Sequence, residues 1–432
     1  MIFHERRQRG RLDLEAVEMA VRSAMHQAGA AVLSELLHYE VPDPEQRTLA
    51  CSCGQNALYR ELRAKPILTV VGEAQLRRPY YLCADCHQGQ FPADVELDVE
   101  KTEFSPGVRR MMARVGSECS SFDRGREQLH LLAGLEVTTK AVERVAEQIG
   151  ADIAAREQAE IHKALQLQLP VVGGPSIPVM YVEMDGTGVP MVRKETEGRR
   201  GKEGERARTR EVKIGCLFTQ TRVDEEGWPV RDEDSTTYVA AIEPASEFSR
   251  RLYTEAYRRG WDRARQKVVL GDGAIWVWNI ADEHFPGATQ IVDLCHARQH
   301  LWDLATKLHP ADEPARCRCV MIHQALLDDG QIEKLVAAFK LLAETNPPLA
   351  EPIQTEAEYF ERNTERMRYP KFRAQGLFVG SGVIEAGCKT VIGTRLKRSG
   401  MFWTVSGANA IIALRCHYLS GKFEDYWESR RA

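Results

Sequence analysis

The 432-residue chain lacks any apolar run near the 18 residues that a membrane-spanning helix needs. Its first residues, MIFHERRQRGRLDLEAVEM, are charged and contain no apolar core of the kind found in secretory signals. An excess of basic residues is also missing, because the formal net charge is −4. These absences predict a cytoplasmic protein without a membrane partner, and they leave any binding of nucleic acid to local basic patches.

The composition predicts a folded protein of several domains. Hydrophobic residues make up 43% of the chain and charged residues 28%, as in ordinary soluble proteins. The chain is too long for one ordinary core, so about two to four domains are expected. Shifts in pattern divide it into a helical arm (1–48), a zinc-ribbon-like module (49–100), a helical region (101–170), and an α/β domain (171–300 and 370–432) that is interrupted by a helical insertion (301–369).

Residues 12–38 carry apolar side chains every three or four positions, from Leu14 to Leu36. This spacing predicts an amphipathic helix. The helix could serve as a dimerisation arm or could pack on a later domain, and we expect the second.

Four of the eleven cysteines form two close pairs, C-x-C at Cys51 and Cys53 and C-x-x-C at Cys83 and Cys86. Between the pairs, KPILTVV and AQLRRPYYL predict two strands joined by a turn. Four thiolates can close a tetrahedral zinc site with no open position, so such a site would be structural. His87 is an alternative ligand, and ordinary reduced cysteines on a small sheet are the other interpretation.

Residues 104–165 predict helices throughout. FDRGREQLHLLAGLEVTTKAVERVAEQIGADI has the pattern of a helix, a turn at Gly134 and a second helix. Lys140 and Arg144 on the second helix are candidate DNA contacts, although the acidic Glu143 and Glu147 lie among them. A DNA-reading helix-turn-helix and a plain helical hairpin fit this segment equally well.

After Pro178 the pattern alternates strands and helices in the order β-β-β-α-β-α-β-α. This is the order of an RNase H-like domain, in which three antiparallel strands are followed by two parallel ones. Asp185 is expected at the end of the first strand, and the fourth strand stops on Asp272. Because the first and fourth strands are neighbours in this order, the two carboxylates are expected to lie side by side. Without these partners, a turn cap would be the safer interpretation of Asp185.

Two close carboxylates repel one another unless a cation neutralises them, and such oxygen ligands suit Mg²⁺ or Mn²⁺. A third carboxylate, Glu385, comes from a late helix for which Ser381 is a candidate N-cap. Lys389 follows four residues later and is a candidate DNA-phosphate contact on the same helix face.

Several phrases together resemble one known family. They are GEAQLRRPYYLCADC, RRMMARVGSECSSFDRGREQL, MYVEMDGTGVP, VVLGDGAIWVWN, IVDLCHARQHLW and GSGVIEAGCKTVIGTRLKRSGMFWT. In this order they resemble the ISKra4 family of insertion-sequence transposases, over roughly residues 50–420.

The resemblance implies a DDE transposase with an RNase H-like core and an acidic triad at Asp185, Asp272 and Glu385. Related families carry a C/D-x-x-H motif after the second aspartate, which falls here on Asp293 and His296. His296 would contact DNA or orient the scissile phosphate, or else be an ordinary buried histidine. Trp403 lies in the family's terminal motif, where it would stack on a flipped base or fill the core.

Two basic clusters are candidate phosphate contacts. RLKRSG, which contains Arg395, Lys397 and Arg398, follows the helix of Glu385. The loop RRGKEGERARTR also contains Glu203 and Glu205, so a solvated loop explains it equally well.

The expected partner is double-stranded DNA, at transposon ends and target, bound by a homodimer or higher oligomer associated with the nucleoid. Two rival functions remain: an RNase H-like nuclease without strand transfer, and a DNA-binding regulator with a silent core. A zinc hydrolase does not fit, because four cysteine ligands leave no open coordination position. His296 and His300 form H-x-x-x-H, but no adjacent glutamate completes a zinc-protease motif.

Overall fold

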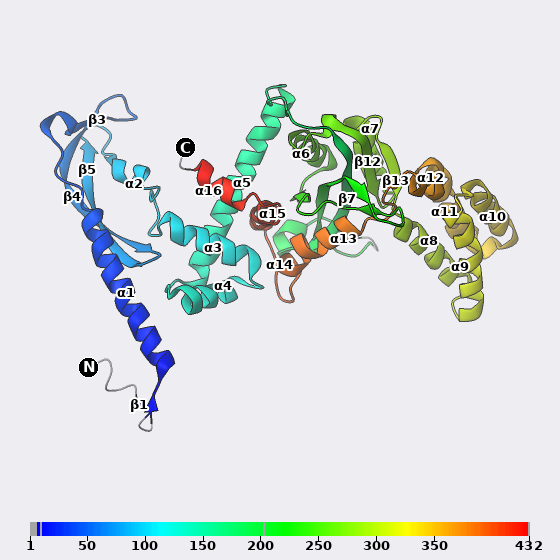
Figure 1. Cartoon of the computed structure of the whole chain (residues 1–432), viewed down its shortest axis with the longest axis horizontal. Helices are drawn as coiled ribbons and strands as arrows, with labels where there is room; N and C mark the ends of the chain where they lie inside the picture. The colour runs from blue at the N-terminus through cyan, green and yellow to red at the C-terminus, as the bar shows by residue number, and fades with distance from the viewer. Residues whose placement is uncertain (1–6, 9–10, 202–203, 431–432) are drawn as a thin grey trace. The chain divides into compact units, whose positions relative to one another are not determined.

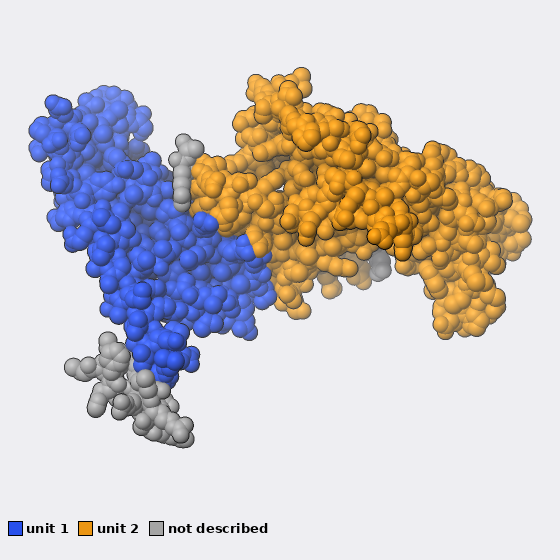
Figure 2. Space-filling view, in the orientation of Figure 1, with its two compact units in different colours: residues 1–148 blue, residues 149–432 orange. Residues whose placement is uncertain are grey.

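The computed structural model describes residues 7–8, 11–201 and 204–430. The chain divides into two compact units, Met1–Gln148 and Ile149–Ala432 (Figures 1 and 2). Each unit has its own β-sheet, and the two units are described separately.

The first unit contains a four-stranded antiparallel sheet in the order β3-β4-β5-β6. Its strands are β3 (Thr48–Ala50), β4 (Asn56–Thr69), β5 (Gly72–Cys83) and β6 (Gly89–Gln90). The long β4–β5 hairpin contains both predicted strands, and β4 begins earlier than predicted, at Asn56. Gly72 has a φ of 105°, which explains why a glycine stands at the turn of this hairpin.

Helix α1 (Leu14–Leu36) confirms the predicted amphipathic helix. It follows a short antiparallel pair, β1 (Arg7–Gln8) and β2 (Arg11–Leu12). Asp13 caps the helix by accepting a hydrogen bond from the N–H of Ala16. Ala30 is buried where α1 meets β5, whereas the predicted apolar stripe is exposed, with Met25 68% and Leu36 75% accessible. The contact with β5 therefore uses another face of the helix.

The helical part of the first unit contains α2 (Pro92–Glu96), α3 (Pro106–Glu118), α4 (Phe122–Gln128), the π-helical turn η2 (Leu129–Ala133) and the start of α5 (Thr139–Leu165). The predicted turn is confirmed at Gly134, which has a φ of 66°. Thr138 caps α5, because its hydroxyl accepts a hydrogen bond from the N–H of Ala141. The segment therefore has the helix, turn and helix that the sequence predicted.

The second unit is built on a five-stranded mixed sheet in the order β11-β8-β7-β12-β13. Its strands are β7 (Ile177–Pro190), β8 (Thr209–Gln220), β11 (Thr237–Ala241), β12 (Ala264–Gly271) and β13 (Thr289–Val292). β7, β8 and β11 pair antiparallel, whereas β12 is parallel to both β7 and β13. The predicted adjacency of the first and fourth strands is confirmed.

Side chains alternate between the two faces of this sheet. On one face, Gly215 lies against Leu252 of α6 (Ala245–Arg258), and Gly271 lies against Val277 of α7 (Ile275–His284). On the other face, Gly387 of α13 (Gly382–Gly387) lies against Ile214 of β8. Glu183 and Asp185 of β7 point to this second face, because Glu183 bonds α13 and Asp185 bonds Cys388 just after it.

The chain after α13 stays helical. It forms the π-helical η7 (Cys388–Gly393), α14 (Thr394–Leu396), α15 (Val405–Leu419) and α16 (Phe423–Ser429). Asn409 of α15 accepts a hydrogen bond at 2.8 Å from the N–H of Ile242, which directly follows β11.

The segment 301–369 is helical, as predicted for an insertion. The helices between β13 and α13 are α8 (Leu294–Leu308), α9 (Glu313–Asp328), α10 (Ile332–Thr345), α11 (Ala350–Arg362) and α12 (Tyr369–Ala374). Their core includes the buried Leu335, Phe339 and Phe360. Across the described part of the chain, no helix combines the length and apolar character needed to span a membrane.

Candidate functional site

Three aspartates occupy matching positions on three neighbouring parallel strands. The register pairs Met184 of β7 with Gly271 of β12, and Gly271 in turn with Val292 of β13. The residues that directly follow these three are all aspartates: Asp185, Asp272 and Asp293. The strand pairing thus brings the first two predicted carboxylates together and adds the third, at the start of α8.

Asp185 does not stand at the end of its strand. β7 continues to Pro190, and Asp185 pairs with Ile214 of β8. The reason is that β8 extends the hairpin beyond the point where β12 ends. The backbone of Asp185 is therefore paired with β8. On the opposite edge of β7, β12 ends at Gly271, and Asp272 follows it.

Glu385 lies in α13, whose first turn is tied to two buried carboxylates. The hydroxyl of Ser381 donates to Oδ2 of Asp293 at 2.6 Å, and the N–H of Ile384 donates to Oε2 of Glu183 at 2.8 Å. Ser381 is the N-cap residue as predicted, but its side chain makes no capping hydrogen bond. It bonds Asp293 instead, so it ties the helix to the sheet rather than capping it.

Asp293, His296 and Glu385 form a tight group in which one ligand atom of each lies within 4.8 Å of the others. Asp293 is fully buried, and its Oδ2 accepts a hydrogen bond from Nδ1 of His296 at 2.6 Å. This hydrogen bond raises the pKa of His296, and the negative charges of Asp272 and Asp185 raise it further. The carboxylates around His296 therefore favour its protonated form.

Asp185 and Asp272 lie outside this tight group, and each carboxylate has local donors. Oδ1 of Asp185 accepts from the N–H of Gly186 at 2.6 Å, and Oδ2 accepts from the thiol of Cys388 at 3.1 Å. Oδ1 of Asp272 accepts from the N–H of Ala274 at 2.9 Å. Both aspartates are half-buried.

Glu183 is a carboxylate of the site that the sequence did not single out. It is fully buried two residues before Asp185 on β7. Burial raises its pKa to about 8. Its position in an otherwise apolar strand is the signal that the sequence offered, since buried carboxyls are rare without a partner.

The helical insertion also contacts the site. The hydroxyl of Tyr359 donates to the backbone carbonyl of Asp272 at 3.1 Å. The ring of Tyr359 stacks on that of His300, with 3.8 Å between centroids, and Nδ1 of His300 bonds Oε2 of Glu356 at 2.7 Å. His300 is thus packed against α11 and bonded to Glu356.

Lys389, Lys397 and Arg398 are exposed, as predicted for phosphate contacts. The ammonium of Lys397 hydrogen-bonds the hydroxyl of Thr187, two residues after Asp185. Phe402, which the sequence did not single out, is 64% accessible on the same loop. Basic groups and one aromatic ring therefore lie on the segment that follows Glu385.

Arg395 and Trp403 lie inside the protein, which agrees with the core alternative for Trp403 and not with an exposed Arg395. Arg395 is fully buried, with its guanidinium carbon 5.1 Å from the centre of the Trp403 ring. Trp403 is 6% accessible, and its indole N–H donates to the carbonyl of Leu396 at 3.1 Å. Trp403 fills the core, and Arg395 packs on its ring, so neither side chain reaches the surface.

Lys140 and Arg144 of the predicted DNA-reading helix are both exposed in α5, in the first unit. Lys140 pairs with Glu143 at 2.8 Å, so its charge is partly compensated. In the basic loop before β8, Lys202 and Glu203 lie outside the described residues.

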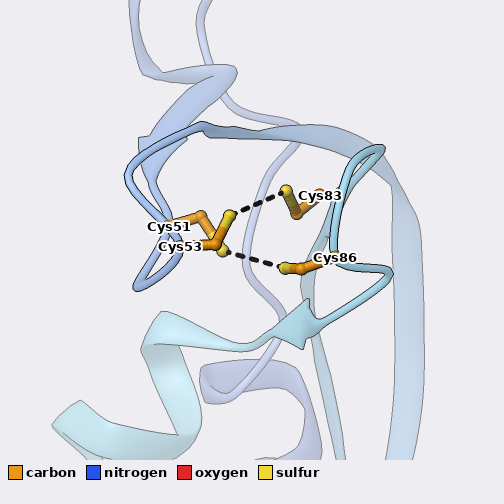
Figure 3. A group of neighbouring side chains, drawn as sticks. All are labelled: Cys51, Cys53, Cys83 and Cys86. Atoms are coloured by element: carbon orange, nitrogen blue, oxygen red, sulfur yellow. Dashed lines mark hydrogen bonds between the residues drawn. The ribbon is translucent and has the colours of Figure 1, made fainter.

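The four cysteines of the first unit converge as the sequence predicted (Figure 3). Sγ of Cys51 lies 3.5 Å from Sγ of Cys86, and Sγ of Cys53 lies 3.7 Å from Sγ of Cys83. A tetrahedral zinc with bonds of about 2.3 Å requires sulfur separations of about 3.8 Å. The N–H of Cys53 helps to lower the pKa of Cys51 to about 6, which favours the thiolate. The group fits zinc without His87.

Comparison with known proteins gives a family and a distant structural likeness. No protein with a curated description matches the chain. Among solved structures, the Drosophila P element transposase strand transfer complex matches with 8% sequence identity and a TM-score of 0.26, covering 79% of this chain and 84% of that chain. A TM-score this low does not establish a common fold. Residues 7–430 match the sequence pattern of Uncharacterised protein family (UPF0236), and the chain belongs to that family.

Proposed function

We propose that this protein is a DDE transposase of the ISKra4 type, which cleaves and joins phosphodiester bonds at the ends of an insertion sequence. The main support is that Asp185 and Asp272 lie beside each other on the paired strands β7 and β12. Glu385 lies on a helix that is hydrogen-bonded to the same sheet. The strand order β11-β8-β7-β12-β13 supports an RNase H-like core. The three strands that come first in the chain, β7, β8 and β11, are antiparallel neighbours, and β12 and β13 run parallel to β7.

The charges of the site support a divalent cation. Asp293 and Glu385 have ligand atoms within 4.8 Å of His296, and Asp185 and Asp272 are close enough for their charges to raise its pKa. Like charges this close are costly unless a cation or protons neutralise them. All four offer carboxylate oxygens, which are the ligands that Mg²⁺ and Mn²⁺ prefer. The donor set therefore fits these ions, and we assign Asp185, Asp272 and Glu385 as their ligands.

Bound Mg²⁺ would acidify the attacking hydroxyl and neutralise charge on the leaving oxygen. The protein's own part is positioning. Asp293 orients His296 by accepting its Nδ1–H, so Nε2 is the ring atom available to a phosphate oxygen. The exposed Lys389, Lys397 and Arg398 supply positive charge for the DNA backbone beside the carboxylates.

The first unit would recognise DNA. We propose that Cys51, Cys53, Cys83 and Cys86 hold a structural Zn²⁺, which would cross-link the two loops at the open end of the β4–β5 hairpin. Lys140 and Arg144 on α5 would contact DNA through an exposed helix face. Binding to chromosomal DNA would locate the protein at the nucleoid, in the cytoplasm. The exposed apolar stripe of α1 is a candidate contact for a homodimer or higher oligomer on the DNA.

The test is cleavage in Mg²⁺ of a duplex carrying the inverted repeats that we expect beside the gene. We expect nicking that exposes a 3′-hydroxyl, followed by joining of that end to a target duplex. D185N, D272N and E385Q should each slow cleavage by about 1,000-fold, since metal sites supply several kcal/mol and 1.36 kcal/mol is tenfold. DNA binding should remain.

The control is E283Q, which neutralises an exposed carboxylate of α7 that is 73% accessible. It should cleave as the unmodified protein does. Cleavage without joining would favour the nuclease, and specific binding without cleavage would favour the silent regulator. Full activity of D185N would overturn the triad.

A further inference from the structure

Glu183 occupies an unusual place beneath the helix of Glu385. It lies two residues before Asp185 on β7, so strand alternation puts both side chains on the α13 face of the sheet. Its side chain is completely inaccessible to solvent. A group with no access to solvent cannot touch a substrate, so its role must be exerted through its neighbours.

The contacts of Glu183 all lead to α13 or to the adjacent strand. Oε2 accepts the N–H of Ile384 at 2.8 Å, and the thiol of Cys216 on β8 lies 3.7 Å from the same oxygen. Among the described residues, Oε1 has no hydrogen-bond partner. The carboxyl is therefore only partly satisfied, and its one strong hydrogen bond goes to the amide directly before Glu385.

The N–H of Ile384 needs an acceptor from outside its helix. α13 begins at Gly382, and the first four N–H groups of a helix have no partner within it. Glu183 supplies that acceptor, and the bond from Ser381 to Asp293 at 2.6 Å supplies a second anchor. The first turn of α13 is thus fixed at two points to the sheet that carries Asp185 and Asp272.

We propose that Glu183 is a positioning residue that fixes α13 through Ile384 and so holds Glu385 where it completes the metal site. This inference rests on the proposed function, because it assumes that Glu385 is a metal ligand. The proposal assigns Glu183 no contact with metal or DNA. The proposed role depends on Oε2 of Glu183, which accepts the hydrogen bond from the N–H of Ile384.

A purely structural role predicts that an apolar replacement loses stability but keeps its metal affinity. Removing the acceptor leaves the buried N–H of Ile384 unsatisfied, which destabilises the fold. Glu183→Met keeps much of the volume but removes the acceptor for Ile384. Glu183→Gln keeps a carbonyl oxygen that can accept the same hydrogen bond. The two variants therefore separate volume from hydrogen bonding.

The experiment is a titration of the full-length protein with Mn²⁺, with free ion measured by electron paramagnetic resonance, together with Mn²⁺-dependent DNA cleavage. E183M should weaken Mn²⁺ binding about 10- to 100-fold, the usual effect of losing a partner that orients a metal ligand. It should also raise the Mn²⁺ concentration for half-maximal cleavage by the same factor. E183Q should bind Mn²⁺ as the unmodified protein does.

The matched control is Val182→Ala. Val182 is buried on the same strand, but its side chain points to the opposite face of the sheet. V182A should lower the melting temperature and leave Mn²⁺ affinity unchanged. If E183M does not yield folded protein, Glu183→Leu also removes the acceptor, and hydrogen exchange in residues 381–388 should then be faster than in V182A.

The outcomes distinguish the two proposals. If the unmodified protein binds no Mn²⁺ at Asp185, Asp272 and Glu385, the metal site of the proposed function is wrong, and the positioning role falls with it. If the unmodified protein binds Mn²⁺ and E183M binds it equally well, the positioning role alone is overturned. Equal weakening by E183M and V182A would also overturn it, because the effect would then come from general loss of stability.

Discussion

Tyr359 of α11 donates its hydroxyl to the backbone carbonyl of Asp272, 87 residues away in sequence, at 3.1 Å. Its ring also lies where a side chain on Gly273 would have to go, since an added Cβ would sit 2.7 Å from two of its atoms. The helical insertion therefore helps to fix the turn on which Asp272 stands. This contact couples the insertion to the proposed chemistry.

Gly273→Ala should impair both stability and cleavage. Gly273 has a φ of 93°, so alanine would be strained by about 1–3 kcal/mol, and it would also displace Tyr359. Asp272 would move with the turn. The measurement is the free energy of unfolding in urea together with the Mg²⁺-dependent cleavage rate.

The control for this prediction is Gly287→Ala. Gly287 also has a positive φ, of 77°, but an added Cβ would meet no atom within 4 Å. It should lose stability through backbone strain alone and should keep the cleavage rate. Equal rates for the two variants would contradict a role of Tyr359 in placing Asp272.

The cysteine cluster should hold about one zinc per chain, as a site with four protein ligands predicts. Metal analysis of the purified protein measures this directly. Cys51→Ser or Cys83→Ser should lose the zinc and destabilise the hairpin, because zinc binding contributes to folding at such sites. Cys317→Ser, an exposed cysteine of α9, is the control and should keep it. Folded protein purified without zinc would refute the assignment.

Lys397→Ala and Arg398→Ala should weaken DNA binding without loss of fold. Each removes an exposed charge, so each should reduce the slope of log affinity against log salt by about one. Arg395→Ala should behave differently, because Arg395 is buried against Trp403. We expect it to lower the free energy of unfolding by about 2–5 kcal/mol, as other large-to-alanine core substitutions do.

Binding isotherms at several salt concentrations, with urea unfolding of the same variants, test this contrast. A stable Arg395→Ala protein with a reduced salt slope would show that Arg395 contacts DNA after all.

The pH dependence of the helical insertion should reflect Glu333 and Arg368. The hydrogen bond from Arg368 lowers the pKa of Glu333 to about 2. A carboxyl with a lowered folded-state pKa stabilises the protein above its unfolded pKa, near 4.3, and loses this contribution as the pH falls towards 2. Glu333→Gln should therefore have a lower melting temperature than the unmodified protein at pH 6.5.

The difference in melting temperature should shrink as the pH falls from about 5 to about 2. Glu333 is exposed and the side chain of Arg368 is 23% accessible, so the effect should be small and reduced by salt. A difference that stays constant with pH would show that the ion pair is not its source.

The sequence predicted the features that depend on local patterns and on strand order. The close spacing of Cys51 with Cys53, and of Cys83 with Cys86, was enough to predict the cluster, because a hairpin brings its ends together. The alternation of strands and helices predicted that β7 and β12 are neighbours. That adjacency placed Asp185 beside Asp272.

Other features depend on contacts between distant segments. The letters RLKRSG indicate a basic surface, but Arg395 folds onto Trp403 and is buried. Glu183 becomes important only because α13, about 200 residues later, directs the N–H of Ile384 at it. Tyr359 contacts Asp272 through the packing of the insertion. Such tertiary contacts leave no periodic signal in the sequence.

The most direct measurement is cleavage of the protein backbone by hydroxyl radicals, with Fe²⁺ and peroxide in place of Mg²⁺. A metal held by Asp185, Asp272 and Glu385 should direct cuts to the segments around these three residues, and excess Mg²⁺ should suppress them. D185N should lose the cuts, whereas E283Q should keep them. Cuts that avoid these segments, or that persist unchanged in D185N, would contradict the metal site.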